Sequence, residues 1–249
     1  SPNVHAVAIE GTFDDCQALV KSMFADTAFR AGHDLATINS INWARIAAQA
    51  AYYVAAALAL GGRGISFAVP TGNFGDVFAG YVARRMGVPI DRLIVATNAN
   101  DILARFLATG RYQTAAVVPT LAPSMDIQVA SNFERLLFEL YDRDGALVRE
   151  RMAELARGGF TVGADRLERA RRLFAGHRLD DAGIRATIAR LHARTGVIVD
   201  PHTACAVAAA EAAEARIHPM VVLATAHPAK FPAAVQAATG WLEEEAFAQ

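Results

Sequence analysis

The sequence predicts an α/β domain built on a parallel β-sheet, with extra helices. Three observations support this fold class. Short apolar runs alternate along the chain with segments that carry helix start and stop signals. The apolar run from Ile65 to Val69 has no polar alternation, as expected of a strand covered on both faces. A turn with two glycines joins this run to a helical pattern, which completes a strand–loop–helix unit.

Length and composition limit the possible functions. The chain has 249 residues, enough for one large domain or a domain and a half, and 53% of them are hydrophobic, which allows a sizeable core. The formal net charge is -1 and no long run of one sign occurs, so neither nucleic acid nor a membrane is the expected partner. Cys16 and Cys205 are far apart and form no CxxC pair. We therefore expect no disulfide framework, no metal site and a cytoplasmic location.

The first segment is predicted to contain one strand and one helix. Val4 to Ile9 has the composition of a short strand. Asp14 or Asp15 is placed to cap a following helix that runs to about Met23.

A long apolar helix is predicted next. Asn39, Ser40 and Asn42 precede it, and Gly61-Gly62 ends it. Its stretch from Ala47 to Leu60 is mostly alanine and is shorter than the ~20 apolar residues that a membrane span needs. We therefore expect a buried helix there and not a membrane segment.

A helix and one further unit of strand and helix follow the strand at 65–69. A helix is predicted from about Gly75 to Met86, then a strand from Leu93 to Ala96, then a helix that starts at Asp101 and ends near Gly110. Asp101 is the candidate cap of that last helix.

The middle of the chain has helical periodicity, and its charged faces are those of solvated helices. The helices predicted there span Asn132 to Tyr141, Ala146 to Ala156, Asp165 to Phe174 and Asp180 to Arg194. A final unit comprises a helix around Ala204 to Ala215, a strand from Met220 to Thr225 and a helix near Ala233 to Ala238.

The stretch from Pro70 to Asp76 carries the clearest chemical signal. Glycines allow backbone N–H groups to approach an anion, and the N-terminus of the following helix adds donors and partial positive charge. The stretch matches neither the GxGxxG nor the GxxxxGK[ST] pattern, which disfavours NAD and ATP. The sequence therefore predicts a phosphate cradle, and the alternative is a plain strand-to-helix turn.

Two other stretches place polar groups near strand or helix ends. The strand that starts near Val221 delivers Thr225 and His227 at its carboxyl end, where ligands of open α/β sheets bind. The Thr225 hydroxyl suits a ring nitrogen, or it caps the following turn. Thr203 is expected to cap a helix, and His202 is either a site group or a partner of the helix start.

Taken together, the motifs of the chain resemble those of threonine synthases of the bacterial and fungal type. They occur in the family's order across most of the chain. They are INSINWARI at 38–46, PTGNFGD at 70–76, ATNANDIL at 96–103, SMDI at 124–127, SNFERLL at 131–137, DPHTA at 200–204 and ATAHPAKF at 224–231.

The resemblance implies a fold-type-II pyridoxal 5'-phosphate (PLP) enzyme, with the three-layer fold of the tryptophan synthase β subunit. The family converts O-phosphohomoserine and water to threonine and phosphate. By this likeness Gly72, Asn73, Phe74 and Asp76 bind the cofactor phosphate, and Thr225 faces the pyridine nitrogen. It also implies that residues 1–40 end a small domain, and that residues 41–249 form part of the large PLP-binding domain, with a helical insertion around 132–195.

One departure from the family pattern concerns the lysine that forms a Schiff base with PLP. The chain contains only Lys21 and Lys230, and neither lies in the family's Phe-Lys-Asp type segment. We therefore expect no catalytic lysine in this chain, which would be an inactive, incomplete part of the enzyme that needs the missing N-terminal part. The alternatives are a non-catalytic threonine-synthase-like binding protein and a relative of the serine/threonine dehydratases.

Overall fold

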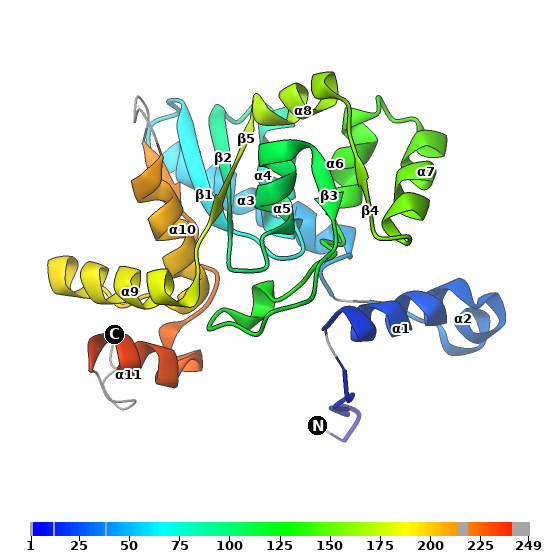
Figure 1. Cartoon of the computed structure of the whole chain (residues 1–249), viewed down its shortest axis with the longest axis horizontal. Helices are drawn as coiled ribbons and strands as arrows, with labels where there is room; N and C mark the ends of the chain where they lie inside the picture. Colours follow the sequence, from blue (N-terminus) through cyan, green and yellow to red (C-terminus); the bar gives the residue numbers. More distant parts are fainter. Residues whose placement is uncertain (1, 12, 38, 214–218, 241–249) are drawn as a thin grey trace. The chain divides into compact units, whose positions relative to one another are not determined.

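A computed structural model describes residues 2–11, 13–37, 39–213 and 219–240 (Figure 1). The chain divides into two compact units, Ser1–Ile38 and Asn39–Gln249. The first unit contains α1 (Phe13–Ala25) and α2 (Thr27–His33). Asp26 caps α2, because its carboxylate accepts hydrogen bonds from the amides of Ala28 and Phe29 at 3.0 and 2.9 Å. The assignment of these parts to a small and a large enzyme domain stays a prediction.

Two predictions in the first unit were wrong. The segment from Val4 to Ile9 is irregular, and the side chains of Val4 and Val7 are 71% and 82% exposed. A strand is stable only when a neighbouring strand accepts and donates its hydrogen bonds, and composition alone does not supply one. Helix α1 begins at Phe13, so Asp14 and Asp15 lie within the helix and not at its cap.

The second unit is built on a parallel sheet, which confirms the predicted fold class. Within the described residues its strand order is β5 (Phe174–Arg178), β2 (Ile90–Thr97), β1 (Ile65–Pro70) and β6 (Met220–Val222). Each neighbouring pair runs parallel. The predicted strand at 93–96 is extended at both ends, and the strand predicted to reach Thr225 ends at Val222.

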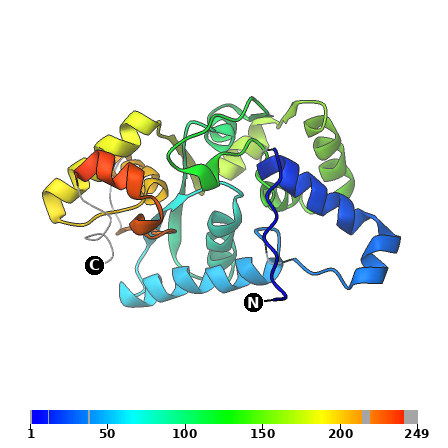
Figure 2. The same ribbon diagram turned by 90° about the horizontal axis from the view of Figure 1, so that it is seen from below.

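Helices cover both faces of this sheet. Phe67 and Val69 of β1 pack into the core with α3 (Trp43–Ala59) and α4 (Gly75–Arg85), whereas Ala68 packs with α9 (Asp181–Thr195) and α10 (Pro201–Ala212). Successive side chains of a strand point to opposite faces, so one short strand joins both cores. Figures 1 and 2 show the resulting layers, with the sheet between the two groups of helices.

Helix α3, which was predicted to be a buried helix, is buried along one face only. Its buried residues Ile46, Ala50, Tyr53 and Ala57 form one stripe at helical spacing, while Leu58 is 75% exposed. Among the described residues, none of the helices has both the length and the apolar character that crossing a membrane requires.

The segment 132–195 is not a purely helical insertion, which corrects the prediction. It holds the expected helices, but also β4 (Gly159–Thr161), which pairs with β3 (Arg111–Gln113), and β5 at the sheet edge. Of the five residues of β5 only Phe174 is fully buried, so the apolar signal of this strand is weak. The helices there are α6 (Phe133–Leu140), α7 (Gly145–Leu155), α8 (Ala164–Arg171) and α9.

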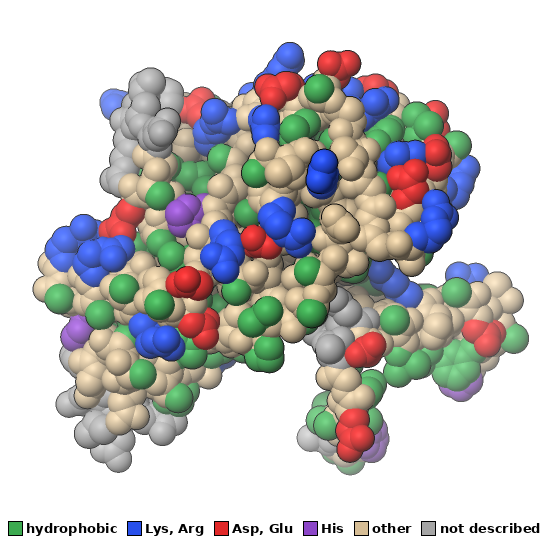
Figure 3. Space-filling model, viewed as in Figure 1, with side chains coloured by type: hydrophobic (Ala, Val, Ile, Leu, Met, Phe, Trp, Pro, Cys, Tyr) green, Lys and Arg blue, Asp and Glu red, His purple; other side chains and the backbone are tan. Residues whose placement is uncertain are grey.

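Helices α5 (Ile102–Thr109), α10 and α11 (Pro232–Thr239) match predicted helices with small shifts, whereas the short helices η1 (Pro123–Met125) and η2 (Pro228–Lys230) were not predicted. Residues 214–218, which include the predicted end of the helix near Ala215, lie outside the described residues. On the face seen in Figure 3, basic and acidic side chains are interspersed over the second unit.

Candidate functional site

The predicted phosphate loop connects β1 to α4 and is held against the sheet. The Thr71 amide donates to the carbonyl of Ala96 at 2.8 Å, and the Thr71 hydroxyl donates to the carbonyl of Val69 at 2.7 Å. Gly72 lies so near η1 that a Cβ at this position would be 2.7 Å from the Ser124 carbonyl oxygen and 3.2 Å from the Met125 Cα. Only glycine fits there without displacing the backbone of η1.

Phe74 ends the loop in a strained conformation. Its φ of 63° lies in the left-handed region, which non-glycine residues rarely occupy. The ring is 2% exposed and lies 5.5 Å from the ring of Phe133 and 5.6 Å from that of Phe174. Packing of the ring therefore holds the backbone in this conformation, which turns the chain sharply from the sheet into α4.

A cavity of about 130 Å³ opens above this loop. Its floor is the loop and the start of α4, where the first amides have no acceptor within the helix. Its wall is formed by α3 and the residues before it. The lining residues are Ser40, Arg45, Gln49 and the segment 70–77. The predicted residues Gly72, Asn73, Phe74 and Asp76 thus line one cavity, and Arg45 adds a cationic residue to it.

Asn132 clamps the loop from the side. The residue is fully buried, and its amide nitrogen donates to the carbonyls of Ser40 at 2.7 Å and Asn73 at 3.1 Å. Its backbone amide also donates to the Asn73 carbonyl at 3.0 Å. One side chain therefore joins the cavity wall to its floor.

Asp76 has an unusual protonation equilibrium. Burial raises the pKa of its carboxyl to about 6, although a hydrogen bond from Tyr53 opposes the shift. The Tyr53 hydroxyl donates to the Asp76 carbonyl at 2.8 Å and lies 3.3 Å from Oδ1. Burial and the nearby carboxylate raise the pKa of Tyr53 well above its usual value, so this hydroxyl stays a donor. The cavity thus carries a carboxyl group that loses its charge in mildly acidic solution.

The carboxyl end of β2 carries a network of polar side chains. Asp126 Oδ1 accepts hydrogen bonds from the amide groups of Asn98 at 2.7 Å and Asn100 at 3.0 Å, and from the Thr120 hydroxyl at 2.6 Å. These bonds join the loop after β2 to the segments on both sides of η1. The motif ATNANDIL therefore shapes the chain beside the phosphate loop.

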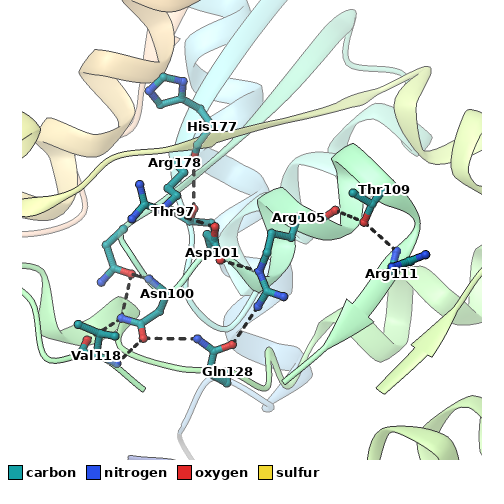
Figure 4. Close-up of polar contacts among 11 residues, drawn as sticks. Thr97, Asn100, Asp101, Arg105, Thr109, Arg111, Val118, Gln128, His177 and Arg178 are labelled. Atoms are coloured by element: carbon teal, nitrogen blue, oxygen red, sulfur yellow. Dashed lines mark hydrogen bonds and ion pairs between the residues drawn. The ribbon is translucent and has the colours of Figure 1, made fainter. Parts of the chain in front are cut away.

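Asp101 does not cap α5 through its side chain, which corrects the sequence prediction. Its carboxylate instead pairs with Arg105 at 2.7 Å and Arg178 at 3.5 Å. Arg105 also donates to Gln128 at 3.3 Å, and Figure 4 shows these groups together. The Asp101 carboxylate forms charge-assisted bonds with two arginines, and it makes no cap hydrogen bond to the helix amides.

Thr225 lies outside the residues that line the cavity. It is exposed and follows β6 by three residues. The cap of the following short helix, η2, is the side chain of His227, which accepts from the Ala229 amide at 3.2 Å. Val222 of β6 pairs with Ala68 of β1. If this register continued beyond the strand, Thr225 would lie level with Thr71. Its predicted role toward the cofactor ring stays a prediction.

Asp200, and not Thr203, caps α10. The Asp200 carboxylate accepts from the amides of His202 and Thr203 at 2.8 and 3.3 Å, and the Thr203 hydroxyl also donates to it. In the described residues there is no group of three or more His, Cys, Asp or Glu side chains that could hold a metal ion.

Sequence reasoning missed several residues that line this cavity or support its lining. Arg45 and Asn132 lie in the quoted motifs, but nothing in their local sequence indicates that they meet. Gln49 and Tyr53 are one and two turns further along α3, so their spacing from Arg45 is the one signal that places them on its face.

Comparisons with known proteins agree with this geometry. Residues 2–154 match the family model of pyridoxal-phosphate dependent enzymes, and residues 203–248 match that of the threonine synthase C-terminal region. The threonine synthase of Pseudomonas aeruginosa is 52% identical over 240 residues, which cover 95% of this chain and 51% of that protein.

Solved structures give the same result. The PLP-bound threonine synthase from Brucella melitensis has a TM-score of 0.89 at 55% identity, over 96% of this chain and 52% of that one. Yeast threonine synthase has a TM-score of 0.83 at 40% identity, over 95% of this chain and 50% of that one. The chain thus spans about half the length of the relatives it matches. By its sequence and its fold, the chain belongs to the pyridoxal-phosphate dependent enzyme family.

Proposed function

We propose that the chain is the phosphate-binding part of a threonine synthase, which uses PLP to convert O-phosphohomoserine and water to threonine and phosphate. The glycine loop carries this proposal. Its backbone is brought to the cavity by a buried strand, and a Cβ at position 72 would collide with η1. The family match and the similarity to threonine synthases support the choice of cofactor and reaction.

The residues of the cavity fit a phosphate group. The first amides of α4 are hydrogen-bond donors at the positive end of a helix dipole, and Arg45 lines the same cavity. Asn132 holds the Asn73 carbonyl and so keeps the neighbouring amides from turning away. The charged Asp76 carboxylate repels an anion, and this repulsion disappears when the carboxyl is protonated.

When bound, PLP would supply the electron sink for removal of protons from the substrate. The part assigned to this chain is to hold the cofactor by its phosphate through the backbone amides of Gly72, Asn73, Phe74 and Asp76, and to place the Thr225 hydroxyl near the ring nitrogen. Lys230 is exposed in η2 and does not line the cavity. We therefore propose that the lysine that anchors PLP belongs to a part of the enzyme outside these residues, and that the enzyme acts in the cytoplasm.

The test uses the natural protein that contains this chain, purified and checked by intact mass. We expect PLP to bind and O-phosphohomoserine to yield threonine and inorganic phosphate in equal amounts. The present chain alone is expected to bind PLP only reversibly, with no adduct after borohydride reduction. PLP binding by the natural protein without any phosphate release would instead identify a non-catalytic relative.

A further inference from the structure

Asp200 and His202 form a buried pair that the proposed function does not use. The exposed fractions of the two residues are 0% and 3%, and His202 Nδ1 lies 2.7 Å from Asp200 Oδ1. Burial acts to raise the pKa of Asp200, but the hydrogen bonds from His202 and Thr203 outweigh burial and lower it. Asp200 is therefore a carboxylate, and it can only accept the hydrogen bond from His202.

The other ring nitrogen of His202 fixes the tautomer of the imidazole. Nε2 lies 3.2 Å from the backbone amide of Ser124, which can only donate. Nε2 must therefore be the bare nitrogen, and Nδ1 carries the proton that is donated to Asp200. The pair is thus a neutral imidazole oriented by a carboxylate, with its acceptor aimed at η1.

His202 touches η1, which packs against the phosphate loop, and the segment after β6, which carries Thr225. Through Ser124 it holds the backbone of η1, against which Gly72 packs with no space for a Cβ. On the other side its ring lies 4.9 Å from the ring of Phe231, in the segment after β6 that also carries Thr225. One buried side chain thereby connects the phosphate loop to the segment expected to face the cofactor ring.

We propose that His202, oriented by Asp200, is a positioning residue that keeps η1 pressed against Gly72 and so holds the phosphate loop in its anion-binding conformation. That the loop binds an anion rests on the proposed function, whereas the role of His202 in holding the loop through η1 does not.

Two isosteric substitutions separate this role from simple packing. In His202→Asn the side-chain amide takes the place of Nδ1 and still donates to Asp200, but no acceptor reaches Ser124. In His202→Gln the side-chain carbonyl takes the place of Nε2 and still accepts from Ser124. Asp144→Asn is the matched control, because Asp144 caps α7 with bonds of 2.8 and 3.1 Å to the amides of Ala146 and Leu147 and touches neither segment.

The first measurement is hydrogen exchange at the backbone amides of residues 72–77 and 124–126 in the full chain without ligand. We expect about fivefold faster exchange in His202→Asn and rates within about twofold of wild type in His202→Gln, as loss of one buried hydrogen bond implies. The Asp144→Asn control should leave these amides unchanged. Equal acceleration in the Asn and Gln variants, or none in the Asn variant, overturns the proposal.

The second measurement needs no variant. Long-range ¹H–¹⁵N spectra of the wild-type chain near neutral pH should show His202 with a protonated Nδ1 and a bare Nε2, and the opposite tautomer overturns the proposal.

Titration of the wild type and of both variants with inorganic phosphate then distinguishes the positioning role of His202 from the proposed function. Weaker phosphate binding in His202→Asn, restored in His202→Gln, supports both. Faster loop exchange with unchanged phosphate binding supports the positioning role and contradicts the anion site.

Discussion

Gly72 and Ser124 lie in contact, such that a Cβ at position 72 would be 2.7 Å from the Ser124 carbonyl oxygen. The two residues belong to the loop after β1 and to η1, and α4, β2, α5 and β3 lie between them in the sequence. This contact makes the anion-binding conformation of the loop depend on a second, distant segment of the chain.

Gly72→Ala is expected to displace the loop. Because the new methyl meets backbone atoms, relief requires movement of η1 or of the loop, and we expect phosphate affinity to fall by about tenfold or more, which is ~1.4 kcal/mol. Isothermal titration with inorganic phosphate measures this.

The control for this change is Gly145→Ala in α7. The nearest atom to a Cβ there is the flexible end of Arg149, at 3.5 Å. We expect this variant to bind phosphate as wild type does. Equal affinities for all three proteins would contradict the close contact between the loop and η1.

Asp76→Asn should change the pH dependence of stability. The carboxyl pKa is raised from 3.8 to about 6 in the folded chain, so folding favours the protonated form. The protonated Asp76 carboxyl contributes fully to the free energy of unfolding below its unfolded pKa, and this stabilisation is lost as pH rises through about 6. The Asn variant lacks this loss, so it should be more stable than wild type by about 3 kcal/mol above pH ~7, with the difference vanishing below pH ~4.

Urea unfolding across this pH range measures that difference, and a constant difference would contradict the buried carboxyl. Sulfate binding provides a second readout, because sulfate keeps both charges over the range. Wild type should bind sulfate more tightly below pH ~6 than above it, and Asp76→Asn should remove that step.

Asn132→Asp tests the clamp between the cavity wall and its floor. The substitution replaces the amide donor, which serves the carbonyls of Ser40 and Asn73, with an oxygen that faces two acceptors. We expect a loss of about 2–4 kcal/mol in the free energy of unfolding. Thermal or urea unfolding measures it, and Gln236→Glu on the exposed side of α11 is the isosteric control, expected to be near neutral.

Cys205 should be chemically inert in the folded chain. Burial raises the pKa of its thiol to about 12, so very little thiolate exists near neutral pH. Iodoacetamide followed by peptide mass analysis should modify Cys16, which is partly exposed, well before Cys205. Labelling of Cys205 should begin only with unfolding, and equal rates for the two thiols in the native chain would contradict the packing of α10 on the sheet.

Part of this structure was predictable because it is local. The apolar run at 65–69, the two glycines after it and the helical pattern from Gly75 all act over a few residues, and they predicted β1, the loop and α4. The stripe of Ile46, Ala50 and Tyr53 follows helical spacing, but the sequence predicted only that this helix is buried, and not which of its faces.

The features that were missed depend on distant partners. Strand β5 forms because it pairs with β2. Its own sequence shows little alternation of buried and exposed residues, so it gives a weak strand signal. Asn132 clamps Asn73 across 59 positions of sequence. The same holds for His202, which the sequence left undecided between a site group and a helix-start partner, and which contacts Ser124 across 78 positions.

The central claim is that the loop from Gly72 to Asp76 binds the cofactor phosphate of a threonine synthase. Its most direct test compares phosphate release from O-phosphohomoserine, with added PLP, by the natural protein that contains this chain and by its Gly72→Ala variant. The account predicts release of phosphate matched by threonine in the wild type, and loss of release with weakened PLP binding in the variant. No release by the wild type, or unchanged release and PLP binding in the variant, would contradict it.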